Sequence, residues 1–202
     1  GGASGDGTLF EEAKTADGYA SAPVALVSFN GTNGKEPVGG LITDTTGDLF
    51  GVTYSGGAND DGTVFGLQKT VSGYAAAPVT IATFNGANGK NPAGGIIADA
   101  AGDLFGTTYS GGANNDGTVF EIIRTASGYA TAPVTIATFN GTNGQNPQGS
   151  LIADVAGDLL GTTTGGGANG DGTVFELSNA GFAVVAILGT FPGLISTAGP
   201  LT

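Results

Sequence analysis

The sequence predicts an all-β protein, a β-propeller of about four four-stranded antiparallel blades. First, the stretch that begins at Asn30 recurs without gaps at Asn85 and Asn140, which defines a 55-residue repeat. Second, 40 of the 202 residues are glycine, a residue that suits turns and bulges better than helix interiors. Third, each repeat contains four short runs of β-branched and aromatic residues. Four such strands at a period of about 40–55 residues are typical of a propeller blade.

The four strands of a repeat are predicted in a fixed order. In one copy, the first strand covers Gly39–Asp44, the second Asp48–Tyr54, the third Gly62–Thr70 and the fourth Ala77–Asn85. The turn TTGD joins the first two strands, the loop SGGANDDG joins the second to the third, and VSGYA joins the third to the fourth. Gly, Asn and Asp at these places are the residues that tight turns require. A connector such as FNGTNGKEP leads to the next repeat.

The chain is predicted to be a single repeat domain over residues 1–202. Residues 1–36 form a partial blade with only a third and a fourth strand, and complete blades follow at 37–91, 92–146 and 147–191. Residues 192–202 resemble a first strand and the start of a second. Together the two end segments would complete one blade and close the ring, which removes the free sheet edges. The alternative is an open array whose incomplete blade is completed by a neighbouring chain.

Composition excludes several classes of function. Seventeen acidic residues against five basic ones give a formal charge of −12, so the basic surface of a nucleic-acid-binding protein is missing. No apolar run approaches the roughly 20 residues of a membrane-spanning helix. Without His or Cys, a serine triad, a cysteine nucleophile and His-based zinc chemistry are excluded. Low charge density, many Thr and Asn, and the absence of Cys predict an exported bacterial protein, extracellular or at the cell surface.

The repeat resembles a known family through the pattern F-N-G-x-N-G-x-x-P-x-G-G-L-I-x-D-x-x-G-D-L-F-G-T-T-x-x-G-G-x-x-x-x-G-T-V-F. This pattern resembles the GloVer tandem repeat, and the match covers nearly the whole chain. The resemblance implies an extracytoplasmic bacterial repeat protein, and it brings neither an activity nor catalytic residues. A weaker similarity to the Asp-box hairpin, a structural element, involves Ala58, Asp60, Gly62, Val64 and Phe65.

Aspartate recurs at three positions of the repeat, and we interpret it first as a residue that caps its own turn. The alternative is calcium, which takes several oxygen ligands. The best candidate loop for calcium is GANDDG with Asp60 and Asp61, whose counterparts include Asp116 and Asp171. The three series are Asp6, Asp61, Asp116 and Asp171; Asp44, Asp99 and Asp154; and Asp48, Asp103 and Asp158.

One face of the predicted propeller is rich in Asn and Tyr, because two kinds of loop emerge there. These are the connector after the fourth strand and the loop between the second and third strands. Such a mixture of polar and aromatic groups suits sugar hydroxyls, although Asn-Gly steps also simply make turns. Thr164 replaces the tyrosine in the last full repeat. The candidate ligand-binding residues are Asn30, Asn33, Tyr54, Asn85, Asn88, Tyr109, Asn140 and Asn143.

The core between blades is predicted from two series of phenylalanines together with aliphatic residues. Tyrosines of the third turn are expected to pack over it. The phenylalanines are Phe10, Phe65, Phe120 and Phe175, and Phe29, Phe84, Phe139 and Phe191. The aliphatic residues include Val64, Val79, Ile96, Ile97, Leu104 and Ile136, and the aromatic residues of the turn are Tyr19, Tyr74, Tyr129 and Phe182.

The predicted function is therefore that of a non-catalytic extracellular module with a structural or adhesive role, and self-association through the incomplete blade is one option. The alternative is a lectin-like propeller that binds a glycan through weak sites multiplied by repetition. A glycoside hydrolase that uses two carboxylates is a remote alternative. No cofactor is expected apart from the calcium alternative.

Overall fold

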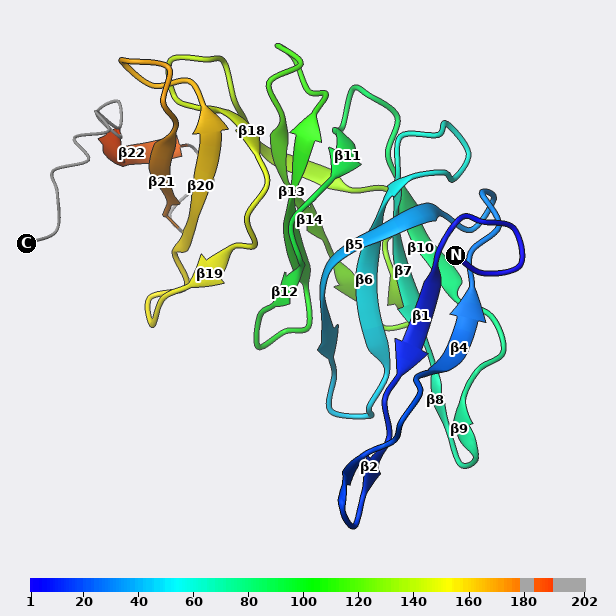
Figure 1. Ribbon diagram of the computed structural model, residues 1–202. Helices are drawn as coiled ribbons and strands as arrows, with labels where there is room; N and C mark the ends of the chain where they lie inside the picture. Colours follow the sequence, from blue (N-terminus) through cyan, green and yellow to red (C-terminus); the bar gives the residue numbers. More distant parts are fainter. Residues whose placement is uncertain (179–183, 191–202) are drawn as a thin grey trace, which may run out of the picture.

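The computed structural model describes residues 1–178 and 184–190, with the side chains of 1–178. Within these residues the chain is all β, and every pair of neighbouring strands is antiparallel except for one isolated bridge between Gly166 and Asp171. Apart from three short hairpins, the strands form the two-stranded sheet β1–β4 and three larger sheets, which follow one another along the chain and lie side by side (Figure 1). The predicted all-β class is confirmed. The predicted closing strand, residues 192–202, lies outside the described residues.

The first two sheets show what a partial and a complete repeat look like. The first sheet pairs β1 (Thr8–Glu11) with β4 (Val24–Ser28). The second sheet has the order β10–β7–β6–β5. Its strands are β5 (Lys35–Thr43), β6 (Leu49–Ser55), β7 (Thr63–Leu67) and β10 (Val79–Thr83).

The third and fourth sheets repeat the second, except that the strand equivalent to β5 is divided into two pieces. We call this strand of each sheet the inner strand. The third consists of β11 (Lys90–Pro92), β12 (Ile97–Ala98), β13 (Leu104–Ser110), β14 (Thr118–Ile122) and β17 (Val134–Thr138). The fourth consists of β18 (Gln145–Pro147), β19 (Ile152–Ala153), β20 (Leu159–Gly165), β21 (Thr173–Leu177) and β22 (Val184–Thr190).

Three short hairpins extend the third strand of the repeat beyond its sheet, as the Gly-centred turns predict. They are β2 (Lys14–Thr15) with β3 (Gly18–Tyr19), β8 (Lys69–Thr70) with β9 (Gly73–Tyr74), and β15 (Arg124–Thr125) with β16 (Gly128–Tyr129).

The inner strand begins earlier than predicted and is interrupted at its glycines. It starts at Lys35, before the predicted blade boundary at residue 37, and its register shifts between Val38 and Ile42. A Cβ atom on Gly39 would lie 2.7 Å from the backbone nitrogen of Gly95. One on Gly94 would lie 2.7 Å from the carbonyl carbon of Gly149. The glycines therefore let the inner strands of three sheets approach to backbone contact, and regular pairing is lost at that point.

Neighbouring sheets are joined by edge-to-face phenylalanine pairs. Each phenylalanine that follows a fourth strand packs against a phenylalanine in the third strand of the next repeat, with ring centroids 5.0 Å apart. The predicted inter-sheet core is thereby confirmed for six of its phenylalanines. These pairs are Phe29 with Phe65, Phe84 with Phe120, and Phe139 with Phe175.

Three residues predicted to lie in or over the core are exposed instead. Val79 is 64% exposed because it begins β10, the outer edge strand of its sheet. Phe10 is 60% exposed because no preceding repeat covers β1 among the described residues, and Tyr19 is 70% exposed on the N-terminal hairpin for the same reason. Tyr129, in contrast, packs on Phe50 of the preceding repeat at 5.5 Å. Phe182 and Phe191 lie outside the described residues.

Pairs of buried threonines connect the second and third strands, which the sequence analysis did not anticipate. The hydroxyl groups of Thr108 and Thr118 are 2.8 Å apart, and the backbone N–H of Thr118 donates to Oγ1 of Thr108. Thr53 with Thr63 and Thr163 with Thr173 repeat this arrangement. Since buried polar groups need partners, each pair fixes the register of its hairpin. The recurrence of the two threonines ten residues apart is the signal that could have revealed it.

Candidate functional site

The candidate site is a depression of about 410 Å³ where the inner strands of three sheets meet. Val38, Ala93 and Gln148 line it, and these are equivalent positions of successive repeats, each directly after the proline of the inner strand. Tyr54 and Tyr109 complete its lining. Each repeat thus contributes the same position to one shared hollow, and two of the repeats add an aromatic side chain.

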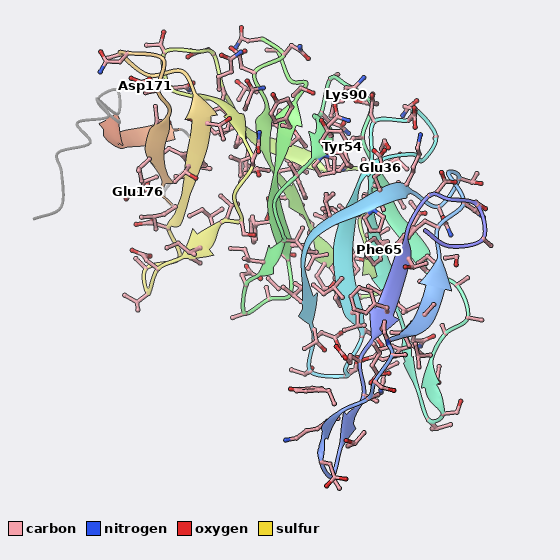
Figure 2. The ribbon with its side chains drawn as sticks, viewed as in Figure 1. Glu36, Tyr54, Phe65, Lys90, Asp171 and Glu176 are labelled. Carbon is pink, nitrogen blue, oxygen red and sulfur yellow. The ribbon has the colours of Figure 1, made fainter. Side chains whose placement is uncertain are left out.

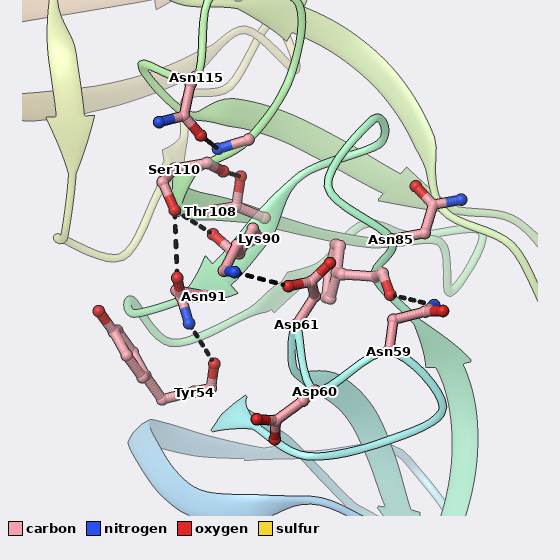
Figure 3. A network of polar contacts seen from close by, with 12 residues as sticks. Tyr54, Asn59, Asp60, Asp61, Asn85, Lys90, Asn91, Thr108, Ser110 and Asn115 are labelled. Carbon is pink, nitrogen blue, oxygen red and sulfur yellow. Dashed lines mark hydrogen bonds and ion pairs between the residues drawn. The ribbon is translucent and has the colours of Figure 1, made fainter.

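Tyr54 and Tyr109 lie at the ends of β6 and β13, and hydrogen bonds to their backbone carbonyl groups fix their positions. The Asn91 amide donates from Nδ2 to the carbonyl oxygen of Tyr54 at 3.0 Å, and Asn146 does the same for Tyr109 at 2.9 Å. Figure 3 shows that the ring of Tyr54 points away from this polar network. Both tyrosines are half-buried. The hydrogen bonds therefore fix the main chain at both tyrosines, while their side chains line the depression, where they can contact a ligand.

Asn91 also bridges two repeats, a role that the sequence analysis missed. Its Oδ1 accepts a hydrogen bond from the Ser110 hydroxyl at 3.1 Å (Figure 3). Its backbone is left-handed, with φ of 56°, and Asn146 and Glu36 at the equivalent positions share this conformation. Asparagine tolerates it better than most residues. The recurrence of a polar residue directly before proline was the available signal.

The predicted Asn residues of the connector form turns, and none of them lines the depression. In the first copy, the backbone N–H of Asn30 donates to Oδ1 of Asn33 at 2.9 Å, and that of Asn33 donates to Oδ1 of Asn30 at 3.1 Å. Asn85 with Asn88, and Asn140 with Asn143, are bonded in the same way. The geometry favours the turn interpretation for these six residues.

The loop between the second and third strands adjoins this connector. The backbone N–H of Gly57 donates to the carbonyl of Gly31 at 2.8 Å, and later copies repeat the bond. Asp60 has a left-handed backbone with φ of 58°. Its Oδ1 accepts from the N–H of Gly56 at 2.9 Å, which caps the loop.

Two of the other aspartates proposed for calcium, Asp61 and Asp116, contact a side chain of the neighbouring repeat. Asp61 forms an ion pair with Lys90 at 3.0 Å (Figure 3), and Oδ1 of Asp116 accepts a hydrogen bond from the Gln145 amide at 2.8 Å. Asp171 is exposed on the fourth sheet, far from Lys90 in Figure 2. In the part of the chain that the structure describes, no three acidic side chains gather in a group that could hold a metal ion.

The turn between the first and second strands is also built by its aspartates. Oδ1 of Asp44 accepts hydrogen bonds from the hydroxyl and the N–H of Thr46, at 2.7 and 2.9 Å, and from the N–H of Asp48. Partial burial acts to raise the pKa of Asp44, but these hydrogen bonds outweigh it and hold the pKa below its ordinary value. Asp48 in turn accepts from the N–H of Lys69 at 2.6 Å.

Two clefts lie between neighbouring sheets at the strand ends remote from Tyr54 and Tyr109. The larger, about 480 Å³, lies between the second and third sheets and is lined by residues that include Phe50, Arg124 and Tyr129. The smaller, about 270 Å³, contains Glu121, and here burial and the nearby charges of Asp103 and Asp99 raise the pKa of its carboxyl group. Glu121 has no counterpart in the second sheet, where Gly66 occupies its position.

Fold and site together define a tandem-repeat, all-β protein whose units are four-stranded antiparallel sheets. The chain belongs to the Gloeobacter/Verrucomicrobia repeat family, whose model matches residues 1–200. This match confirms the resemblance to the GloVer repeat. A comparison with curated proteins found no match. The described residues contain no helix long and apolar enough to cross a membrane.

Proposed function

We propose that the chain is a non-catalytic repeat module with a structural or adhesive role, exported to the outside of a bacterial cell. The observation that supports this proposal most directly is that the recurring polar side chains form hydrogen bonds and ion pairs within the fold itself. Asp44, Asp60 and the paired asparagines accept backbone hydrogen bonds in turns. Asp61 and Asn91 join neighbouring repeats. Architecture therefore accounts for their recurrence, and the remote alternative of a carboxylate-based hydrolase gains no support from these residues.

The proposed architecture is a four-bladed propeller in which each large sheet is one blade. Two observations support it. The inner strands of three sheets meet at Gly39, Gly94 and Gly149, as blades do at a propeller axis. Successive sheets also pack through equivalent phenylalanine pairs. The fourth blade would combine β1 and β4 with residues 192–202. An open array, in which chains associate through the incomplete blade, is the alternative.

Scattering measurements test this architecture. We expect a particle of 19.5 kDa at every protein concentration in light scattering. We also expect a radius of gyration of about 17 Å in small-angle X-ray scattering, the value for a compact domain of this length. Calcium should change neither quantity, because Asp60 already accepts a backbone hydrogen bond, and Asp61 and Asp116 are engaged by Lys90 and Gln145. A mass that rises with concentration would replace the closed propeller with the open array.

A second candidate function is carbohydrate binding in the depression, and the placement of Tyr54 and Tyr109 there favours it. Aromatic rings pack against the apolar faces of sugars, while the tyrosine hydroxyl and the Gln148 amide offer hydrogen bonds. A hollow with aromatic walls and a few polar groups is the usual form of a small-molecule site. The ligand class would be a neutral glycan, since the chain carries a formal charge of −12.

The double variant Tyr54→Ala and Tyr109→Ala tests this second candidate. We expect it to lose glycan retention by about tenfold or more on an array of immobilised glycans, because two stacking surfaces disappear and each tenfold corresponds to about 1.4 kcal/mol. The matched control is Tyr19→Ala, which removes an exposed tyrosine outside the depression. Retention by the double variant, or the absence of any glycan bound by the native chain, would reject carbohydrate binding and leave the structural role.

A further inference from the structure

The cleft between the second and third sheets has the size and lining of a small-molecule site. Its volume is about 480 Å³, and ligand-binding pockets usually measure roughly 300–1,000 Å³. Two copies of the same turn line it, the turn between β5 and β6 and the turn between β12 and β13, which lie at the same end of the two sheets (Figure 1). Its apolar lining includes Leu104, Phe50 and Tyr129, and the two rings are 5.5 Å apart.

Arg124, the single arginine of the chain, is the cationic group of this cleft. Its guanidinium lies over the Tyr129 ring, 4.5 Å from the ring centroid, and its backbone N–H donates to Oδ1 of Asp103. Within the described residues, no carboxylate forms an ion pair with it. Stacking occupies the face of the guanidinium and leaves the N–H donors at its edge, which can bind an oxyanion through two parallel hydrogen bonds.

Two carboxylates line the same cleft, Asp44 from one turn and Asp99 from the other. In both, the backbone N–H groups of the turn donate to one oxygen, Oδ1. The other oxygen, Oδ2, remains to accept hydrogen bonds from a ligand. Partial burial acts to raise the pKa of Asp44, but the turn hydrogen bonds outweigh it and hold the pKa below its ordinary value. This carboxylate is therefore charged at neutral pH.

The cleft thus combines one cation with two anions that form no ion pair with one another among the described residues. The aspartates repel a ligand that carries only a carboxylate, and Arg124 repels a ligand that carries only an amine. We propose that the cleft binds a zwitterion with an apolar side chain, namely an amino acid or a short peptide. The ligand carboxylate binds Arg124, and its ammonium group binds Asp44 and Asp99. Its side chain packs against the apolar lining at Phe50.

This combination occurs once in the described part of the chain. In the second sheet, Lys69 lies over Tyr74 at 4.1 Å, but an ammonium group cannot form the planar two-bond contact that a guanidinium makes with a carboxylate. The described part of the preceding repeat also contains no turn equivalent to that of Asp44. The smaller cleft, between the third and fourth sheets, contains Glu121 and has no basic residue among its described lining. The proposed site is additional to the structural role and separate from the depression.

Titration of the isotope-labelled chain, followed by two-dimensional NMR, tests the site. The probes are L-leucine and the dipeptide leucyl-leucine, and whichever binds more tightly distinguishes an amino acid from a peptide. Isocaproate and isoamylamine are matched analogues, since each keeps the apolar part of leucine but carries only one of its charges. We expect a zwitterionic probe to shift the amide signals of Ala101 and Arg124 until they saturate, while those of Tyr54 and Tyr109 stay unchanged. Each analogue should bind about tenfold more weakly, because it lacks one charge-assisted contact.

Two charge variants give a readout that a loss of structure would not. Asp99→Asn keeps an oxygen acceptor for the turn, and it should raise the affinity for isocaproate relative to leucine. Arg124→Gln should instead raise the affinity for isoamylamine relative to leucine. The matched control is Lys69→Gln, which alters the equivalent pair with Tyr74 outside this cleft and should leave every affinity unchanged.

Three results would overturn the proposal. Equal affinities for leucine and its two analogues would show that the cleft selects apolar groups alone. The absence of localised shifts with every probe would show that the cleft binds no such ligand. Unchanged preferences in both charge variants would remove Arg124 and Asp99 from the site. None of these results bears on the particle mass or on the glycan array, so failure of this site is distinguishable from failure of the proposed function.

Discussion

Phe120→Ala is expected to lower the free energy of unfolding by about 3–5 kcal/mol, the usual cost of removing a buried phenylalanine. Phe120 has no exposed surface, and it lies in the cluster that joins the second and third sheets. Its ring packs edge-to-face on Phe84 at 5.0 Å, so the substitution removes area burial and an aromatic pair together. Urea denaturation followed by circular dichroism measures the change.

The control for this variant is Val71→Ala, at a fully exposed position of the hairpin turn between β8 and β9. Its effect should stay within about 0.5 kcal/mol, as is usual for surface sites. If Phe120→Ala cost no more than this control, the sheets would not be packed through their phenylalanines. The inter-sheet core would then have to be abandoned.

Gly62→Ala should lower the free energy of unfolding by about 2–5 kcal/mol, from two sources that add. The backbone φ of 98° disfavours any residue with a Cβ atom by about 1–2 kcal/mol. The new Cβ atom would lie 2.5 Å from Cδ of Pro92 in the next repeat and 2.5 Å from the carbonyl oxygen of Thr53. Such overpacking costs about 1–3 kcal/mol. Thermal and chemical denaturation both measure the effect.

Two other glycines distinguish the cost of the positive φ from the cost of crowding by the new Cβ atom. Gly73 also has a positive φ, of 137°, but no atom lies within 4 Å of its added Cβ, so Gly73→Ala reports the backbone strain alone. Gly40→Ala, with no neighbour within 4 Å, should be close to neutral. An equal loss for Gly62→Ala and Gly73→Ala would show that Pro92 and Thr53 do not crowd this position.

Much of the local structure could be predicted because it depends on residues that are close in sequence. The reciprocal bonds of Asn30 with Asn33 span three residues, and the cap from Asp44 to Asp48 spans four. Strand identity followed from β-branched and aromatic runs between glycines. The start of the inner strand was predicted too late, because Lys35, Glu36 and Pro37 were assigned to the connector between repeats. In the structure Pro37 lies within β5, and Glu36, directly before it, has a left-handed backbone conformation.

The candidate site was only half predictable. Tyr54 and Tyr109 were chosen from their place at the strand ends, and they do line the depression. Val38, Ala93 and Gln148 were not, since they are apolar or polar residues of no unusual pattern and lie 55 residues apart. The asparagines were chosen for their chemistry, but hydrogen bonds within the turn already engage their carbonyl oxygens.

The sequence by itself determined the repeat, its strands and its turns, because these follow from side-chain periodicity and from the conformations that glycine and asparagine allow. Only the tertiary structure decided which equivalent residues are covered. Phe10 and Phe65 occupy the same position of the repeat, yet one is exposed and the other is buried. The physical reason is that burial at this position depends on the preceding repeat, and no repeat precedes β1 among the described residues.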